Sequence, residues 1–268
     1  MHYELCDLKK QIVTAACVAG EGHIASAFSI LDILWVLYET ILRHDPASPD
    51  SANRDRFILS KGHASLGLYA ILAQRGFFPM ESLRAFASAS SRLGGHPDSR
   101  KVPGIEASTG SLGHGMPMAV GMALGLKIRD AEPRVICIVG DGECNEGTTW
   151  ESALIANQFK LGNLVALIDR NRQQSFGDTE ETIALDPFDE KWRAFGWNVF
   201  EVDGHDHTQI SDALLKAKEN NDSKPTVVIC NTTKGKGVSF MENEVVWHYR
   251  PPNDEQFNLA LAELEALK

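Results

Sequence analysis

Hydrophobic residues along this chain alternate between short β-branched runs and longer stretches with helical spacing. Four short runs bounded by glycine, proline or polar residues are typical of strands buried on both faces of a parallel sheet: residues 134–139, 164–169, 197–202 and 226–230. A shorter strand is expected at 54–59. Strands that alternate with helices need crossover connections, so the pattern predicts an α/β fold built on a parallel sheet.

The stretches with helical spacing predict the helices between these strands. They cover residues 4–19, 29–42, 64–75, 79–88, 115–128, 146–160, 188–195, 208–220 and 254–267. In the helix at 146–160 we expect Trp150, Leu154 and Ile155 to face inward. The last helix is amphipathic, so we divide the chain into a main domain at 1–252 and a C-terminal amphipathic helix at 253–268.

Composition and charge argue against a nucleic-acid-binding, membrane or secreted protein. With a net charge of −10 over 268 residues, the chain has no basic field to attract nucleic acid or anionic lipid. Its five cysteines are scattered and lack CxxC spacing, as expected in a reducing compartment. The start is polar and acidic, unlike a signal peptide, and the apolar run at 116–126 is too short to span a membrane. We therefore expect a cytoplasmic protein with no nucleic acid and no membrane as partners.

Polar groups follow two of the predicted strands. Gly140-Asp141-Gly142 ends one strand, and Asn171 follows the next. Ligands bind at the carboxyl ends of strands in open α/β sheets, and carboxylate and amide oxygens suit Mg²⁺. A Gly-Asp-Gly tripeptide on its own is usually a tight turn, but its pairing with Asn171 across a strand–helix–strand unit favours a metal site.

This combination resembles the thiamine diphosphate signature, and the segments GDGECNEG at 140–147 and KLGNL at 160–164 are similar to those of transketolases. The resemblance implies a three-layer, parallel-sheet thiamine diphosphate-binding fold. It also implies thiamine diphosphate and Mg²⁺ as cofactors. Asp141, Asn171 and the main-chain carbonyl of Gln173 would hold the metal, beside Gly140 and Gly142.

Four histidine turns carry the resemblance further. They are Gly22-His23, the Ser60-Lys61-Gly62-His63-Ala64 segment, Gly95-His96 and Trp247-His248. Each could be an ordinary capping or turn histidine. In transketolases their counterparts lie, in order, by the cofactor's reactive carbon, at its diphosphate, at the donor sugar's hydroxyls, and at both diphosphate and substrate.

Two further segments match the family. Main chain near Gly110 and Leu112 would lie beside the aminopyrimidine. Glu146 is either an exposed acid favoured by the helix dipole or, by resemblance, an interface residue near the partner glutamate that activates the cofactor. The expected catalytic set is thus His23, His96, His248 and Glu146, and the expected cofactor set is His63, Gly110, Leu112, Gly140, Asp141, Gly142, Asn171 and His248.

Three positions depart from the family pattern. Ala25 replaces a glycine, His114 replaces a glutamine that follows Leu-Gly, and Tyr249 replaces a glycine. A phenol beside the substrate funnel is equally compatible with an unusual substrate and with a different path for the tail.

The chain ends where a full-length transketolase would begin its pyrimidine-binding domain. We therefore expect the N-terminal subunit of a split transketolase, which transfers a two-carbon ketol unit from a ketose to an aldose as an α₂β₂ complex with a C-terminal subunit. Sugars or sugar phosphates are the expected substrates, and the sequence does not identify them. The alternatives are another thiamine diphosphate enzyme subunit (deoxyxylulose-phosphate synthase-like or dehydrogenase E1) and a non-catalytic regulatory paralogue.

Overall fold

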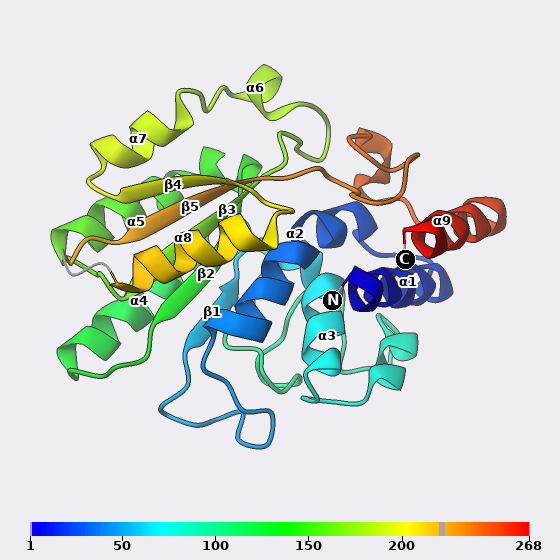
Figure 1. Ribbon diagram of the computed structural model, residues 1–268, viewed down its shortest axis with the longest axis horizontal. Helices are drawn as coiled ribbons and strands as arrows, with labels where there is room; N and C mark the ends of the chain where they lie inside the picture. The colour runs from blue at the N-terminus through cyan, green and yellow to red at the C-terminus, as the bar shows by residue number, and fades with distance from the viewer. Residues whose placement is uncertain (1, 220–222, 268) are drawn as a thin grey trace.

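The computed structural model describes residues 2–219 and 223–267, and within these residues five parallel strands form one sheet (Figure 1). Their spatial order is β1-β2-β3-β5-β4. The strands are β1 (Arg56–Leu59), β2 (Val135–Gly140), β3 (Leu164–Arg170), β4 (Asn198–Asp203) and β5 (Thr226–Asn231). Each begins and ends within about two residues of the predicted range, so the strand predictions are confirmed.

The α-helices of the described residues are α1 (His2–Ala19), α2 (Ile24–Val36), α3 (Ser65–Gln74), α4 (Gly115–Ile128), α5 (Gly147–Gln158), α6 (Thr179–Thr182), α7 (Phe188–Ala194), α8 (His207–Glu219) and α9 (Asp254–Ala266). The predicted helix at 79–88 is wrong, because this segment forms the shorter 3₁₀ helix η3 (Met80–Ala85). The helix predicted from residue 29 begins at Ile24, five residues earlier, and continues as a π-helical turn, η1 (Leu37–Ile41). Residue 220, the predicted end of α8, lies outside the described residues.

Helices cover both faces of the sheet (Figure 1). In β2, Ile136 and Ile138 belong to the core cluster that includes α1, α2, α3 and α8. Val135, Cys137 and Val139 belong to a second cluster, which includes α4, α5 and α7. Alternate side chains thus enter separate cores, which explains the continuous apolar run. The predicted three-layer architecture is confirmed.

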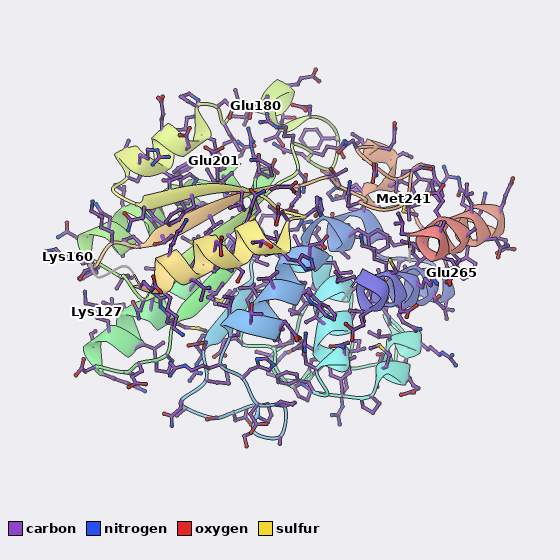
Figure 2. The ribbon with its side chains drawn as sticks, viewed as in Figure 1. Lys127, Lys160, Glu180, Glu201, Met241 and Glu265 are labelled. Atoms are coloured by element: carbon purple, nitrogen blue, oxygen red, sulfur yellow. The ribbon has the colours of Figure 1, made fainter. Side chains whose placement is uncertain are left out.

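Helix α9 packs against α1 beside the main body of the chain (Figure 1). Its Ala260 and Leu264 are fully buried and belong to the same core cluster as α2. Charged side chains cover the outside of the layers; Lys127 and Lys160, for example, lie at one end of the molecule, where α4 and α5 finish (Figure 2). There the ammonium of Lys127 donates to the main-chain oxygens of Phe159 and Lys160.

The segment Ile24–Ile41 is long and apolar enough to cross a membrane by length and composition. The candidate for a membrane-spanning segment is therefore this segment and not the run at 116–126. Within this fold, 83% of the segment is buried, as in a core helix.

The outward-facing side of α5 differs from the prediction. Leu154 and Ile155 are 58% and 45% exposed. Thr149, Ser152, Ala153 and Ala156 form its buried face instead. Helix α5 packs against α4, and Trp150 packs against the second core cluster as predicted, whereas Leu154 and Ile155 point away from it.

Candidate active site

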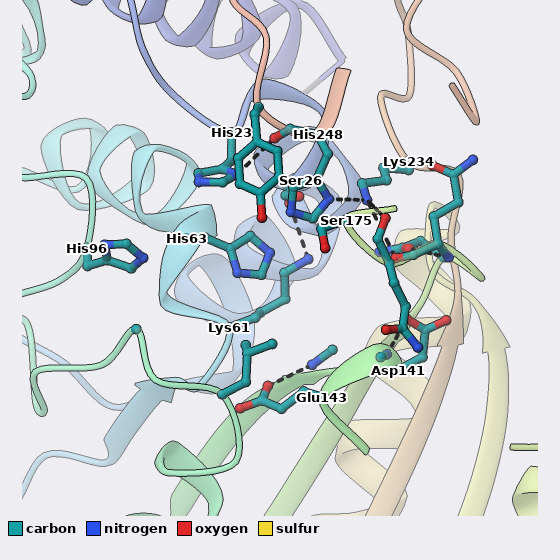
Figure 3. A pocket seen from close by; sticks show the side chains of 18 residues that line it. His23, Ser26, Lys61, His63, His96, Asp141, Glu143, Ser175, Lys234 and His248 are labelled. Atoms are coloured by element: carbon teal, nitrogen blue, oxygen red, sulfur yellow. Dashed lines mark hydrogen bonds between the residues drawn. The ribbon is translucent and has the colours of Figure 1, made fainter. Parts of the chain in front are cut away.

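A cavity of about 330 Å³ lies at the carboxyl edge of the sheet (Figure 3). It brings together residues from segments far apart in the sequence. The predicted site residues that line it are His23, His63, His96, Gly110, Leu112, Gly140, Asp141, Gly142, Asn171, Gln173 and His248. Parallel strands place all their carboxyl ends at one edge, which is why these segments meet.

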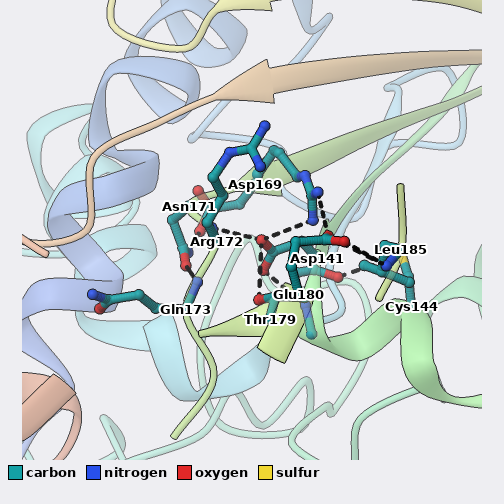
Figure 4. Close-up of polar contacts among 12 residues, drawn as sticks. Asp141, Cys144, Asp169, Asn171, Arg172, Gln173, Thr179, Glu180 and Leu185 are labelled. Atoms are coloured by element: carbon teal, nitrogen blue, oxygen red, sulfur yellow. Dashed lines mark hydrogen bonds and ion pairs between the residues drawn. The ribbon is translucent and has the colours of Figure 1, made fainter. Parts of the chain in front are cut away.

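Asp141, which directly follows β2, is held by main-chain donors (Figure 4). Its Oδ1 accepts from the N–H of Gly142 at 2.8 Å, and its Oδ2 from the N–H of Arg172 at 2.7 Å. The guanidinium of Arg170 lies 3.6 Å away. Burial, followed by the nearby charge of Asp169, raises the pKa of Asp141 to about 6. The buried carboxylate is therefore short of positive charge.

Asn171 follows β3, and its amide is oriented by its neighbours (Figure 4). Nδ2 donates to Asp169 at 2.8 Å, and Oδ1 accepts from the N–H of Gln173 at 3.0 Å. The main-chain oxygen of Gln173 lies 3.5 Å from the ammonium of Lys234. The two strand ends thus place a carboxylate, an amide oxygen and a carbonyl along one side of the cavity.

These donors fit Mg²⁺ bound together with a phosphate-bearing molecule. Among the described residues, no group of three or more His, Cys, Asp or Glu side chains could hold a metal ion. A cation beside Asp141 would therefore draw further ligands from phosphate and water, as Mg²⁺ usually does. It would also supply the positive charge that the buried carboxylate lacks.

A buried ion pair that the sequence analysis missed lies under the cavity. Lys61 pairs with Asp169, and both side chains are almost fully buried. Asp169 also accepts hydrogen bonds from Ser29 and Thr232. Burial alone would raise the pKa of Asp169, but the Lys61 charge and these hydrogen bonds hold it below its usual value. The pair joins the turn after β1 to β3 and places the charged Lys61 side chain in the wall of the cavity.

Glu143, another missed residue, is a buried acid with three donors. It accepts hydrogen bonds from the Ser60 hydroxyl and from the main-chain N–H groups of Gly113 and Gly140. Burial nevertheless raises the pKa of its carboxyl group. Glu143 thereby ties the loop before α4 to the ends of β1 and β2.

Three histidines from separate turns meet in the cavity (Figure 3). The ring centroids of His23 and His63 are 5.1 Å apart, those of His23 and His248 5.3 Å, and those of His63 and His248 5.5 Å. Tyr249 packs on two of them, with centroids 5.0 Å from His23 and 4.5 Å from His248.

All three imidazoles are held in the neutral form. Burial, the largest cause, lowers the pKa of His23 to about 4 and that of His248 to about 3, and it also lowers the pKa of His63. Nearby lysines add to the effect on each ring. Burial likewise lowers the pKa of Lys234 to about 8. Neutral imidazoles can both accept and donate hydrogen bonds, so these rings can bind hydroxyl and carbonyl groups.

His96 lies at the exposed rim, apart from the other three histidines (Figure 3). Gly110 packs against it so closely that an added Cβ would meet the His96 ring at 2.7 Å. The φ angle of Gly110 is +148°, which also favours glycine. Leu112, two residues on, is 38% exposed at the cavity edge.

Glu146 is the predicted site residue that lies outside this cavity. It is exposed at the N-cap position of α5 and packs beside Gly113. The residues missed by the sequence analysis that line the cavity are Ser26, Lys61, Glu143, Gln174, Ser175 and Lys234. Several lie next to recognised motifs: Lys61 precedes the Gly62-His63 turn, and Glu143 directly follows Gly142.

Comparison with known proteins identifies the chain's relatives. Residues 8–264 match the family described as "Transketolase, thiamine diphosphate binding domain". A relative from Actinobacillus succinogenes, named as one of the subunits of an apulose-4-phosphate transketolase, is 41% identical over 257 residues, covering 96% of this chain and 92% of the relative. The "6-deoxy-6-sulfo-D-fructose transketolase subunit SqwG" of a Clostridium species is 42% identical over 246 residues, covering 92% and 89%.

The fold agrees with solved transketolases. The transketolase of Campylobacter jejuni superposes with a TM-score of 0.91 at 30% identity over 98% of this chain. This chain spans 42% of that protein.

These comparisons confirm the predicted fold, the transketolase resemblance and thiamine diphosphate as the cofactor of the family. They favour transketolase over the alternative thiamine diphosphate enzymes. The family match extends over nearly the whole chain and includes every strand of the described sheet. The chain therefore belongs to the transketolase family and comprises its thiamine diphosphate-binding domain.

Proposed function

We propose that this chain is the diphosphate- and metal-binding subunit of a two-chain transketolase, which transfers a two-carbon ketol unit from a ketose to an aldose. The observation that carries the proposal is the convergence of four histidine turns with Asp141 and Asn171 on one cavity. Thiamine diphosphate, when bound, supplies the chemistry for breaking and forming carbon–carbon bonds, and the protein supplies binding, orientation and electrostatics.

In this proposal, Mg²⁺ is held by the side-chain oxygens of Asp141 and Asn171 and by the main-chain oxygen of Gln173. The raised pKa of Asp141 supports this role, because a nearby cation would favour its ionised form. The residues that hold the remainder of the cofactor are His63, Gly110, Leu112, Gly140, Gly142 and His248. All of them line the same cavity.

His23, His96 and His248 are the proposed catalytic residues of this chain. Neutral imidazoles can accept a proton from a hydroxyl group or donate a hydrogen bond to a carbonyl oxygen, as proton movement during ketol transfer requires. Glu146 has a different proposed place, at the interface with the partner chain. Its exposure at the start of α5 supports that placement.

The partner is a chain that carries the pyrimidine-binding half, and the proposed assembly is α₂β₂. Relatives named as subunits, of which this chain covers 92% and 89%, support a second component. Exposed apolar side chains on α4, on α5 and directly after α5 offer a surface for it: Ile128, Leu154, Ile155 and Phe159. We retain residues 1–252 as the cofactor-binding unit and 253–268 as an added helix, and we infer a cytoplasmic location.

Reconstitution tests this function. The 268-residue chain should show no ketol transfer alone and should become active when a C-terminal transketolase subunit, thiamine diphosphate and Mg²⁺ are added. Names of relatives direct the choice of donors, so the panel should contain a phosphorylated, a sulfonated and a neutral ketose. Turnover by the chain free of any partner would refute the two-chain proposal, and inactivity of the assembled complex toward every donor would refute the transketolase assignment.

A further inference from the structure

The hydrogen bonds of His23 determine which of its ring nitrogens carries the proton. Its Nδ1 lies 2.8 Å from the main-chain oxygen of His248. A carbonyl oxygen accepts hydrogen bonds and cannot donate, so Nδ1 of His23 must be the protonated nitrogen. In the neutral ring, Nε2 of His23 is then an acceptor.

Lys234 imposes the opposite arrangement on His248. The Lys234 ammonium lies 2.7 Å from Nδ1 of His248 (Figure 3). An ammonium group donates and cannot accept, so Nδ1 of His248 accepts and the ring proton is on Nε2. Lys234 is 1% exposed, which leaves little access for water to replace it. The main-chain oxygen of Gln174 also interacts with this ring, and the same oxygen accepts from the Lys234 ammonium at 3.4 Å, so the ammonium supplies the donor on this side of His248.

We propose that Lys234 is a positioning residue for His248, whose ammonium keeps the imidazole proton on Nε2 and so makes His248 a donor where His23 is an acceptor. The two rings lie 5.3 Å apart in one cavity. A ketose carries a hydroxyl group next to a carbonyl group. The hydroxyl matches the acceptor on His23, and the carbonyl oxygen matches the donor on His248.

This match to a ketose rests on the proposed function. The assignment of the two tautomers rests only on the hydrogen bonds of His23 and His248. Ring-nitrogen NMR therefore tests the inference on the full chain without cofactor or partner. Long-range ¹H–¹⁵N correlation spectra of histidine-labelled protein distinguish protonated from unprotonated ring nitrogens, and His248→Gln and His23→Gln identify the two residues' signals. We expect a proton on Nε2 of His248 and on Nδ1 of His23. In the wild-type spectrum, a proton on Nδ1 of His248 would overturn the inference.

Lys234→Met removes the donor and keeps a side chain of similar length. His248 should then lose its single tautomer and populate both forms, while Lys236→Met, two residues away on a half-exposed side chain, should leave His248 unchanged. A variant spectrum in which His248 keeps the proton on Nε2 without Lys234 would overturn the inference. In the assembled enzyme, Lys234→Met should lower kcat roughly 10-fold, the scale of one lost charge-assisted hydrogen bond. If Lys236→Met lowers kcat equally, the effect belongs to the loop and not to the Lys234–His248 pair.

Discussion

The main-chain N–H of Arg172 donates to Oδ2 of Asp141 at 2.7 Å, which joins the ends of β2 and β3 at the proposed metal site. Asp141 is therefore both a structural acceptor and the carboxylate nearest the proposed Mg²⁺. A substitution must separate the two roles. Asparagine comes nearest to this, because it removes the charge and keeps one acceptor oxygen, although its NH₂ group cannot accept from the second of the two main-chain N–H groups.

Asp141→Asn should weaken Mg²⁺-dependent binding of thiamine diphosphate by about 2–3 kcal/mol, because the lost interaction involves a charged group. Isothermal titration calorimetry of the assembled complex measures this change. Asp130→Asn, on an exposed residue just after α4, is the matched control and should bind normally. Unchanged affinity in a folded Asp141→Asn variant would remove Asp141 from the metal site.

His23 should make the chain less stable in mild acid. Its pKa falls from 6.5 to about 4 on folding because the ring is largely buried. The neutral form is thus favoured in the folded state, so this stability is present above pH 6.5 and is lost as the pH falls toward 4. Between pH 7 and pH 5 the loss should be about 2 kcal/mol. Urea unfolding of wild type and His23→Gln at both pH values gives the difference, and an equal pH dependence in the two proteins would contradict the prediction.

The sequence predicts those features of this structure that neighbouring residues encode, and it does not predict contacts between distant segments. β2 and β3 are continuous apolar runs bounded by glycine or polar residues, so their positions could be predicted closely. Asp141 and Asn171 follow them directly, and this placed the carboxylate and the amide oxygen at one sheet edge. In contrast, two of the three partners of Glu143, Ser60 and Gly113, come from separate segments that only the fold brings to it.

Helical spacing also does not predict which face of a helix is buried within its own chain. Leu154 and Ile155 have the spacing of a buried face but are exposed, while Ala153 and Ala156 are buried in the second core cluster. Hydrophobicity indicates that a side chain is more stable away from water. It does not indicate whether the side chain packs against its own chain or against another chain.

The exposed apolar side of α5 gives a prediction for assembly. Leu154→Glu places a charge where we propose the partner chain binds, and an unpaired buried charge is costly. Complex formation should weaken at least 10-fold, measured by sedimentation with the C-terminal subunit, while the folding of the isolated chain is unaffected. Leu259→Glu on α9, a similarly exposed position, should assemble normally. Normal assembly of Leu154→Glu would place the interface elsewhere.

Tyr249 provides a test of substrate specificity. Its ring packs on His23 and His248 at the cavity, at a position where the transketolase pattern has glycine. Tyr249→Gly should raise the donor KM about 5- to 10-fold, the scale of one lost aromatic contact, and leave cofactor affinity unchanged. Tyr249→Phe should retain most of the wild-type KM. If both variants match wild type with every donor, the phenol only redirects the following chain.

The separation of His96 from the other histidines predicts two kinetic classes. His63 lies within 5.5 Å of both His23 and His248, measured between ring centroids, whereas His96 lies at the exposed rim against Gly110. His63→Ala should therefore raise the thiamine diphosphate concentration needed for half-maximal activity, by roughly 10-fold for one lost hydrogen bond to an anionic group. His96→Ala should instead raise the donor KM or lower kcat, with cofactor affinity close to wild type. Steady-state kinetics of the assembled enzyme, with cofactor and donor varied separately, distinguish the two effects. If His96→Ala changes the cofactor requirement and leaves donor kinetics intact, its proposed place at the donor sugar is wrong.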